Sequence, residues 1–267
     1  MHGAYRKMAK KRPQKKRRKI QATSIALLPI NELPNSGRHY LDQEKFAEAI
    51  KIFRRLLQES KDEQWAEPLC SSFLGRINQL AGKGMHKEAL VIFHNMENQL
   101  PDQTRKLQGQ HILLLMHAGE LAKAQQLYET TKDTLGRDQK QRVEEAFATL
   151  LLSGNKGLGE GFPPDSPLGS QFVHAQKALR CYAQGQDSEA LESLQYIPFR
   201  SPYRNFLMAL KGMLAFHERQ DKARSFFDKV DTDSPFFALI TPYCHLLEYE
   251  KGGEKEQREL GKKEKNV

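Results

Sequence analysis

The chain has 267 residues and a formal net charge of +9, and it is long enough for one large domain or an extended repeat array. It contains no run of about 18 apolar residues, so we expect no membrane-spanning helix. The three cysteines, Cys70, Cys181 and Cys244, are odd in number and far apart, which favours a location in the reducing cytoplasm.

The positive charge belongs to the N-terminal segment, which we interpret as a basic disordered tail and connector over residues 1–31. Ten lysines and arginines lie between residues 6 and 19, and the first acidic residue is Glu32. Removing these ten from the 42 basic residues leaves 32, against 33 acidic residues, so the rest of the chain is nearly neutral. The segment also lacks apolar periodicity, which is typical of disorder.

A basic tail of this kind can bind nucleic-acid phosphates, lie on acidic lipid, act as a nuclear address or simply improve solubility. It is not a signal peptide, because the apolar run Ile25–Ile30 is too short and is interrupted by Pro29. For the first role, the candidate nucleic-acid-binding residues are Lys10, Lys11, Arg12, Lys15, Lys16, Arg17, Arg18 and Lys19.

Along the rest of the chain, a small alanine followed four residues later by a large apolar residue recurs, with a turn a few residues upstream. The pairs are Ala49 with Phe53, Ala89 with Phe93, Ala124 with Tyr128, Ala190 with Leu194, and Ala223 with Phe227. The intervals between the alanines are 40, 35, 66 and 33 residues. Since 66 is twice 33, we expect one degenerate unit between Ala124 and Ala190. Six units of about 34 residues would cover most of the chain.

The first of these units begins near Leu33, and residues 32–153 form an N-terminal set of repeats. The clearest unit runs from Phe73 to Pro101, where two short amphipathic helices are joined by a turn at Gly82–Gly84. Neither helix is long enough to be stable alone, so each needs the apolar face of the other. A helix from about Lys140 to Leu152 ends this set.

A glycine- and proline-rich segment, residues 154–169, follows and is predicted to be a long loop, because such a composition does not hold a helix. It is not a phosphate-binding loop, since it follows a helix and lacks both the GxGxxG and the GK[ST] patterns. Residues 170–249 form a C-terminal set of repeats and end in a helix that starts near Phe236 and is apolar all round. Residues 250–267 alternate in charge, and we expect a charged flexible tail.

The recurring units resemble the tetratricopeptide-repeat family, whose unit is a helix–turn–helix of about 34 residues. The resemblance is carried in the first unit by Gly37, Tyr40, Phe46, Ala49, Ile50, Phe53 and Leu57, and in the second by Leu80, Gly84, Ala89, Phe93 and Pro101. It implies an all-α fold, a right-handed superhelix of about five to six helix–turn–helix repeats (an α-solenoid) whose concave face holds a partner protein or peptide. In this family the first helix of each pair lines that face. The resemblance therefore points to the following partner-binding residues: Arg38, Asn78, His117, Tyr182 and Phe216.

The sequence carries no pattern for catalysis or for metal binding. It has no HExxH, CxxC or GxSxG motif, its histidines are scattered, and its carboxylates are mostly those of solvated helix surfaces. We therefore expect no enzymatic activity, no cofactor and no metal site.

We interpret the protein as a cytoplasmic scaffold or adaptor that holds a partner protein or peptide in a concave groove. Two alternatives remain open. One is a nucleic-acid-associated, RNA-binding helical-repeat protein that uses its basic tail; the second unit also resembles the pentatricopeptide repeats that bind RNA, although Gly75 stands at their base-reading position. The other is a regulatory module for an enzyme encoded nearby.

Overall fold

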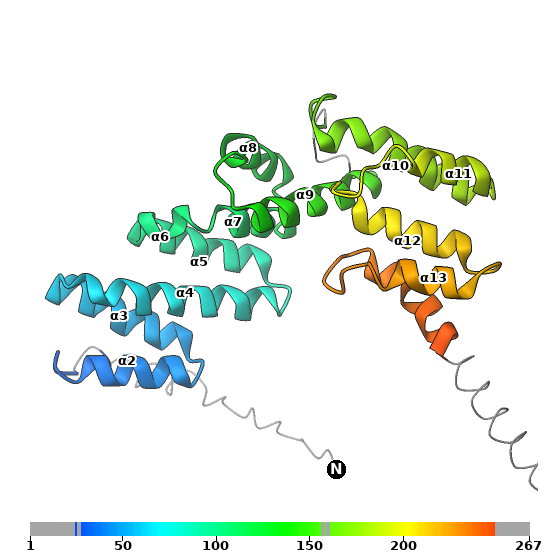
Figure 1. Cartoon of the computed structure of the whole chain (residues 1–267). Helices are drawn as coiled ribbons and strands as arrows, with labels where there is room; N and C mark the ends of the chain where they lie inside the picture. Colours follow the sequence, from blue (N-terminus) through cyan, green and yellow to red (C-terminus); the bar gives the residue numbers. More distant parts are fainter. Residues whose placement is uncertain (1–24, 26–27, 156–157, 159–160, 249–267) are drawn as a thin grey trace, which may run out of the picture. The chain divides into compact units, whose positions relative to one another are not determined.

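The fold is all-helical over the described part of the chain. The computed structural model describes residues 25, 28–155, 158 and 161–248, and these contain helices and turns but no β-strand (Figure 1). This confirms the prediction of an all-α fold. The expected tails at residues 1–19, with their eight candidate nucleic-acid-binding residues, and at 250–267 lie outside the described residues.

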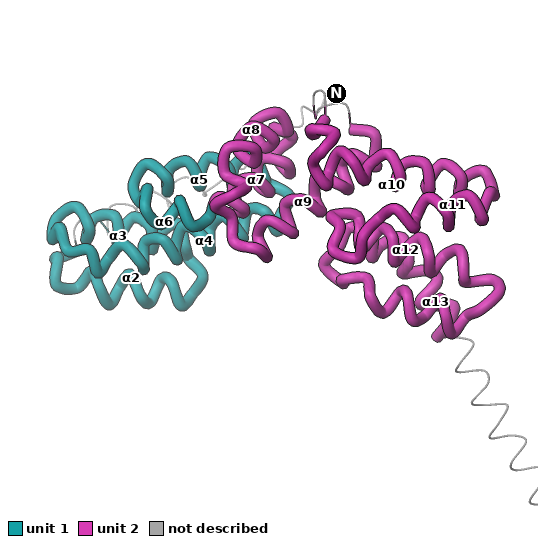
Figure 2. Tube along the Cα trace, turned by 45° about the horizontal axis from the view of Figure 1, so that its top comes forward, with its two compact units in different colours: residues 1–107 teal, residues 108–267 magenta. Residues whose placement is uncertain are grey.

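The chain divides into two compact units, residues 1–107 and residues 108–267 (Figure 2). The predicted loop at residues 154–169 therefore falls inside the second unit. The first unit contains the helices α2 (Leu33–Asp42), α3 (Phe46–Ser60), η1 (Glu63–Trp65), α4 (Ala66–Ala81), α5 (His86–Gln99) and α6 (Pro101–Arg105). Within it, α2 packs on α3, α3 on α4 and α4 on α5.

The second unit contains α7 (Gln108–His117), α8 (Leu121–Thr131), α9 (Arg137–Leu152), α10 (Pro167–Ala183), α11 (Asp187–Leu194), α12 (Arg204–Ala215) and α13 (Gln220–Phe227). A last helical segment covers residues 237–248. Helices α7 and α8 form one pair, α10 and α11 a second, and α12 and α13 a third, while α9 packs between α7 and α10. No helix among the described residues is both long enough and apolar enough to cross a membrane.

The alanines of the recurring sequence pattern all lie within the helix pairs of the structure. All five are fully buried, and each lies on the second helix of its pair: Ala49, Ala89, Ala124, Ala190 and Ala223. The large apolar residue four positions later is also buried in every case. A small side chain permits the close approach and the large one fills the space one turn further on.

The turns inside four of the pairs share one backbone geometry. The second helix begins two residues after a residue with positive φ, at Glu44 (54°), Gly84 (71°), Gly119 (83°) and Gly185 (72°). Three of these four are glycine, which adopts this left-handed region without steric cost. The equivalent turns indicate that the pairs are variations of one structural unit.

In two of the helix pairs, a phenylalanine ring of the second helix packs so closely on the first helix that only glycine fits beneath it. A Cβ atom on Gly37 would lie 2.8 Å from the ring of Phe53, and one on Gly212 would lie 2.2 Å from the ring of Phe227. These distances are shorter than any van der Waals contact between carbon atoms. The first and the last pair therefore use the same glycine–phenylalanine packing.

Helix α9 has no second helix of its own among the described residues, and the chain that follows it supplies a side chain instead. The ring of Phe162 lies 4.8 Å from that of Phe147 on α9 and 6.0 Å from that of Tyr128 on α8, between ring centroids. Phe162 is buried, and the carbonyl of Gly161 accepts a hydrogen bond of 2.7 Å from Gln125. The predicted loop is therefore packed at this point. Helix α10 begins at Pro167, inside the range predicted as loop, because the Ser166 side chain accepts a bond from the Gly169 N–H and caps it.

Candidate functional site

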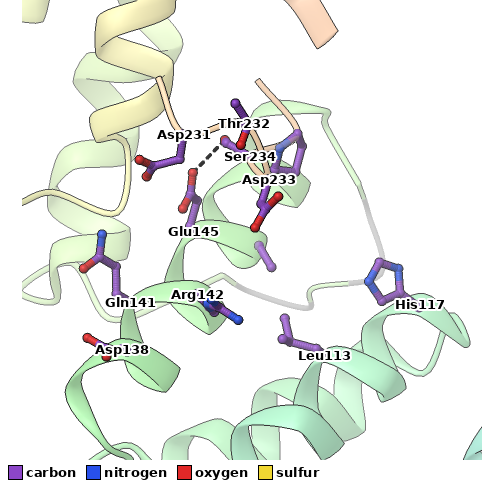
Figure 3. A pocket seen from close by; sticks show the side chains of 12 residues that line it. Leu113, His117, Asp138, Gln141, Arg142, Glu145, Asp231, Thr232, Asp233 and Ser234 are labelled. Carbon is purple, nitrogen blue, oxygen red and sulfur yellow. Dashed lines mark hydrogen bonds between the residues drawn. The ribbon is translucent and has the colours of Figure 1, made fainter. Parts of the chain in front are cut away.

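A groove of about 690 Å³ lies within the second unit (Figure 3). Its walls come from α7, from α9 and from the segment 231–235, which follows α13. The lining residues are Leu113, His117, Asp138, Gln141, Arg142, Glu145, Ala146, Asp231, Thr232, Asp233, Ser234 and Pro235. The residues that meet in this groove are far apart in the sequence, so it exists only in the folded unit.

The segment 231–235 is held against α9 by a buried polar network centred on Asn205 of α12. The Asn205 side chain is 1% exposed. Its Nδ2 donates to Asp231 Oδ2 at 3.0 Å and to Glu145 Oε1, and its Oδ1 accepts a bond of 3.1 Å from the Asp231 N–H. Ser234 Oγ donates a further bond of 2.7 Å to Glu145 Oε1, shown as a dashed line in Figure 3. One amide thus joins three elements of the unit.

The same segment is anchored at both its ends. Arg204 forms an ion pair with Asp231, with 3.5 Å between NH1 and Oδ2. After the segment, the ring of Phe236 is buried against that of Phe206, at 5.7 Å between centroids, and its N–H donates to Ser234 Oγ at 3.3 Å. Because both ends are fixed, the groove wall is formed before any ligand binds.

The groove is rich in negative charge. Its lining contains four carboxylates and one guanidinium, a net charge of −3 if His117 is neutral. Asp138 and Asp233 are exposed, and their side chains have no hydrogen bond or ion pair with any described residue. Leu113, Ala146 and Pro235 add apolar surface between the charges. The groove therefore combines negative potential with a partly apolar lining.

The four carboxylates do not form a metal site. Among the described residues, no group of three or more His, Cys, Asp or Glu side chains is placed so that it could hold one metal ion. Glu145 and Asp231 are already occupied by Asn205, Ser234 and Arg204. The four carboxylates can attract a ligand that carries several separate positive charges, rather than one metal cation.

Of the five residues predicted to bind a partner, His117 is the one that lines this groove. Arg38 on α2 and Asn78 on α4 are exposed in the first unit. Tyr182 at the end of α10 and Phe216, directly after α12, lie in the second unit away from the groove lining. Within the second unit, the structure therefore does not gather His117, Tyr182 and Phe216 into one site.

Tyr182 and Phe216 contact Tyr243 of the last helical segment. The rings of Phe216 and Tyr243 meet edge to face at 5.0 Å, and Phe216 is buried. Tyr182 is hydrogen-bonded to Tyr243; its burial, followed by this bond, raises the pKa of Tyr182 to about 12. The chain itself thus covers the surface that these two residues were expected to offer to a partner.

No sequence pattern identified Asp138, Glu145, Asn205 or Asp231 as site residues. One signal was available, because Asp231 and Asp233 flank a threonine in a short segment that ends in Ser234-Pro235. Such acidic turns are common on protein surfaces, however, and Asn205 lies in a mostly apolar helix without any motif around it. Only the three-dimensional contacts single these residues out.

In comparisons with known proteins, no family model, no curated protein and no solved structure matches this chain.

Proposed function

We propose that the protein is a tetratricopeptide-like helical-repeat scaffold or adaptor that binds a positively charged segment of a partner protein in the groove between α7, α9 and residues 231–235. The observation that carries this proposal is the net charge of −3 on the lining of a groove whose wall is already anchored. Because little ordering is needed on binding, a preformed site of this kind loses less affinity to conformational entropy.

A lysine- or arginine-containing segment suits this lining better than an apolar or acidic one. Asp138 and Asp233 have no side-chain partner among the described residues, so a cationic side chain can pair with them without displacing an existing bond. The methylene stems of lysine and arginine can pack on Leu113, Ala146 and Pro235 while their charged ends meet the carboxylates. Charge complementarity of this kind contributes to specificity and to the association rate.

The repeat architecture and the cytoplasmic location belong to the same proposal. Five equally placed, fully buried alanines and four equivalent turns support a relationship among the helix pairs. Stacked helix pairs present extended binding surfaces, which is the usual role of helical-repeat proteins.

Fluorescence anisotropy with a labelled peptide of alternating arginine and leucine tests this proposal. We expect the Asp138→Asn/Asp233→Asn double variant to bind the peptide roughly 2- to 30-fold more weakly, since each solvated ion pair contributes about 0.2–1 kcal/mol. The matched control is Asp42→Asn/Glu88→Gln, which removes the same charge at exposed positions of the first unit. Equal affinities of the two double variants would refute the groove as the binding site.

A second candidate function is nucleic-acid association through the basic tail, which is favoured by the ten lysines and arginines between residues 6 and 19. Phosphate binding by such a tail weakens steeply with salt and does not depend on Asp138 or Asp233. The same pair of groove variants therefore separates the two functions, because an oligonucleotide bound by the tail should bind both variants at least as well as the wild type.

A further inference from the structure

A second surface of the same unit combines exposed aromatic rings with unpaired positive charge. It is formed by α10 and by the segment 195–203 between α11 and α12. Tyr196 and Phe199, both in that segment, are each 60% exposed. A patch of exposed apolar side chains rimmed by polar residues marks an interaction site.

Both rings are held in place by neighbouring side chains. Tyr196 stacks on His174 of α10, with ring centroids 4.8 Å apart and an angle of 18° between the planes. The guanidinium of Arg204 lies 4.9 Å from the centroid of the Phe199 ring. Each ring therefore has one supported face, and its large exposed fraction leaves the opposite face available to a ligand.

The charge around the rings is positive. Neither α10 nor the segment 195–203 contains an aspartate or a glutamate. Lys177, Arg180 and Arg200 are exposed and form no ion pair with any described residue. At 3.6 residues per turn, Lys177 lies one turn from His174 on the same side of α10, close to the Tyr196 ring, whereas Arg180 lies about 120° round the helix. The nearest acidic residue along the chain is Glu192 on α11, four positions before Tyr196, and Asp231 is already paired with Arg204.

We infer that this surface, consisting of His174, Lys177, Tyr196, Phe199 and Arg200, binds single-stranded nucleic acid. Bases stack on the open faces of Tyr196 and Phe199, and the cations contact the phosphates. This is the combination by which sequence-tolerant single-strand sites operate, because every base offers a π-face whereas a duplex hides those faces.

Fluorescence anisotropy of the full chain tests this inference with a labelled oligo(dT) strand of about 16 nucleotides and with a duplex of the same length. The variants are Tyr196→Leu/Phe199→Leu, which removes the rings but keeps apolar side chains, and Lys177→Gln/Arg200→Gln, which removes charge. The matched control for the first is Val91→Ala, a change at another exposed apolar residue, in the first unit.

We expect the leucine double variant to bind the single strand at least about fivefold more weakly and the duplex as well as the wild type does, since base–aromatic stacking acts only on unpaired bases. The plot of log K against log salt has a negative slope. In the glutamine double variant this slope should become less steep by about 0.7 for each phosphate that the variant no longer neutralises. The basic tail is present in every variant, so its contribution cancels.

Two results would overturn the inference. In the first, the leucine double variant binds the single strand as tightly as the Val91→Ala control. In the second, the leucine double variant weakens the binding of labelled poly-glutamate as much as it weakens the binding of oligo(dT), which would identify an acidic protein segment as the ligand. Because these experiments do not involve Asp138 or Asp233, their failure leaves the groove proposal intact.

Discussion

Ser234 donates a hydrogen bond of 2.7 Å to Glu145, a residue 89 positions earlier in the chain. Both residues line the groove, and the bond joins the segment after α13 to α9. Asn205, buried between them, contacts Glu145 as well as Asp231. The groove is therefore a product of long-range contacts, and its shape depends on a small number of polar atoms.

The Asn205→Ala substitution tests this dependence. It leaves the Asp231 N–H without its partner and removes one of the two bonds to Glu145 Oε1, which keeps the bond from Ser234, so we expect a loss of about 1–3 kcal/mol in the free energy of unfolding. Urea denaturation measures the loss. Asn78→Ala, at an exposed position of α4, is the matched control and should change stability by less than about 0.5 kcal/mol. Similar values for both substitutions would show that the network does not stabilise the unit.

The Ala89→Leu substitution tests the close approach of paired helices. Ala89 is fully buried on α5, so three additional carbon atoms overpack the contact with α4 at a cost of about 1–3 kcal/mol. Thermal and urea unfolding provide the measurement. Lys87→Leu places the same side chain on the exposed side of the same helix and should have little effect. If both substitutions change stability equally, Ala89 does not mark a helix contact.

The Gly119→Ala substitution tests the common turn geometry. Gly119 has a φ of +83° and open space around the position of a Cβ atom, so the effect is one of backbone strain alone. We expect a destabilisation of about 1 kcal/mol. Gly119→Asn is the control, because asparagine adopts the left-handed region more readily than alanine does and should cost less. A destabilisation by asparagine as large as that by alanine would contradict the explanation by φ.

The Tyr182→Phe substitution tests the contact with the last helical segment through its pH dependence. In the folded state the pKa of Tyr182 is raised to about 12 by burial and by the bond to Tyr243, above its ordinary value of 10. The folded state thus holds this proton more tightly than the unfolded state does. The contribution to stability is complete below pH 10 and is lost as the pH rises towards 12.

We therefore expect the variant to lose stability less steeply than the wild type between pH 10 and pH 12. Tyr196→Phe, at an exposed tyrosine, is the control and should follow the wild-type curve. Denaturation monitored by circular dichroism at several pH values gives both curves. A Tyr182→Phe curve parallel to that of the wild type would mean that this hydroxyl does not titrate in the protected environment described above.

The sequence was sufficient to predict the features that depend on local periodicity. The alanine pairs and the turn at Gly82–Gly84 follow from residues within one or two helical turns of each other. The groove could not be predicted in this way. Its network joins Asn205 to a residue 60 positions earlier and another 26 positions later, and no local pattern contains such contacts.

Two further differences have a clear physical cause. Composition correctly predicted the break in the helical pattern after α9, but it did not show that Phe162 would fill the space beside Phe147. Similarly, the last helix was predicted to be apolar all round, which did not say what its apolar side chains would contact. That Tyr243 would cover Tyr182 and Phe216 is visible only in the folded structure, because several apolar residues of that helix could have faced inward.

The proposed function depends most on one claim, that the groove between α7, α9 and residues 231–235 binds a basic segment. Hydrogen–deuterium exchange of the full chain with and without a saturating peptide of alternating arginine and leucine tests this claim most directly. We predict slower exchange in the second half of α7, in residues 137–146 and in residues 231–235, with no change in α4. Protection in α4 or elsewhere in the first unit, with none in residues 231–235, would contradict the claim.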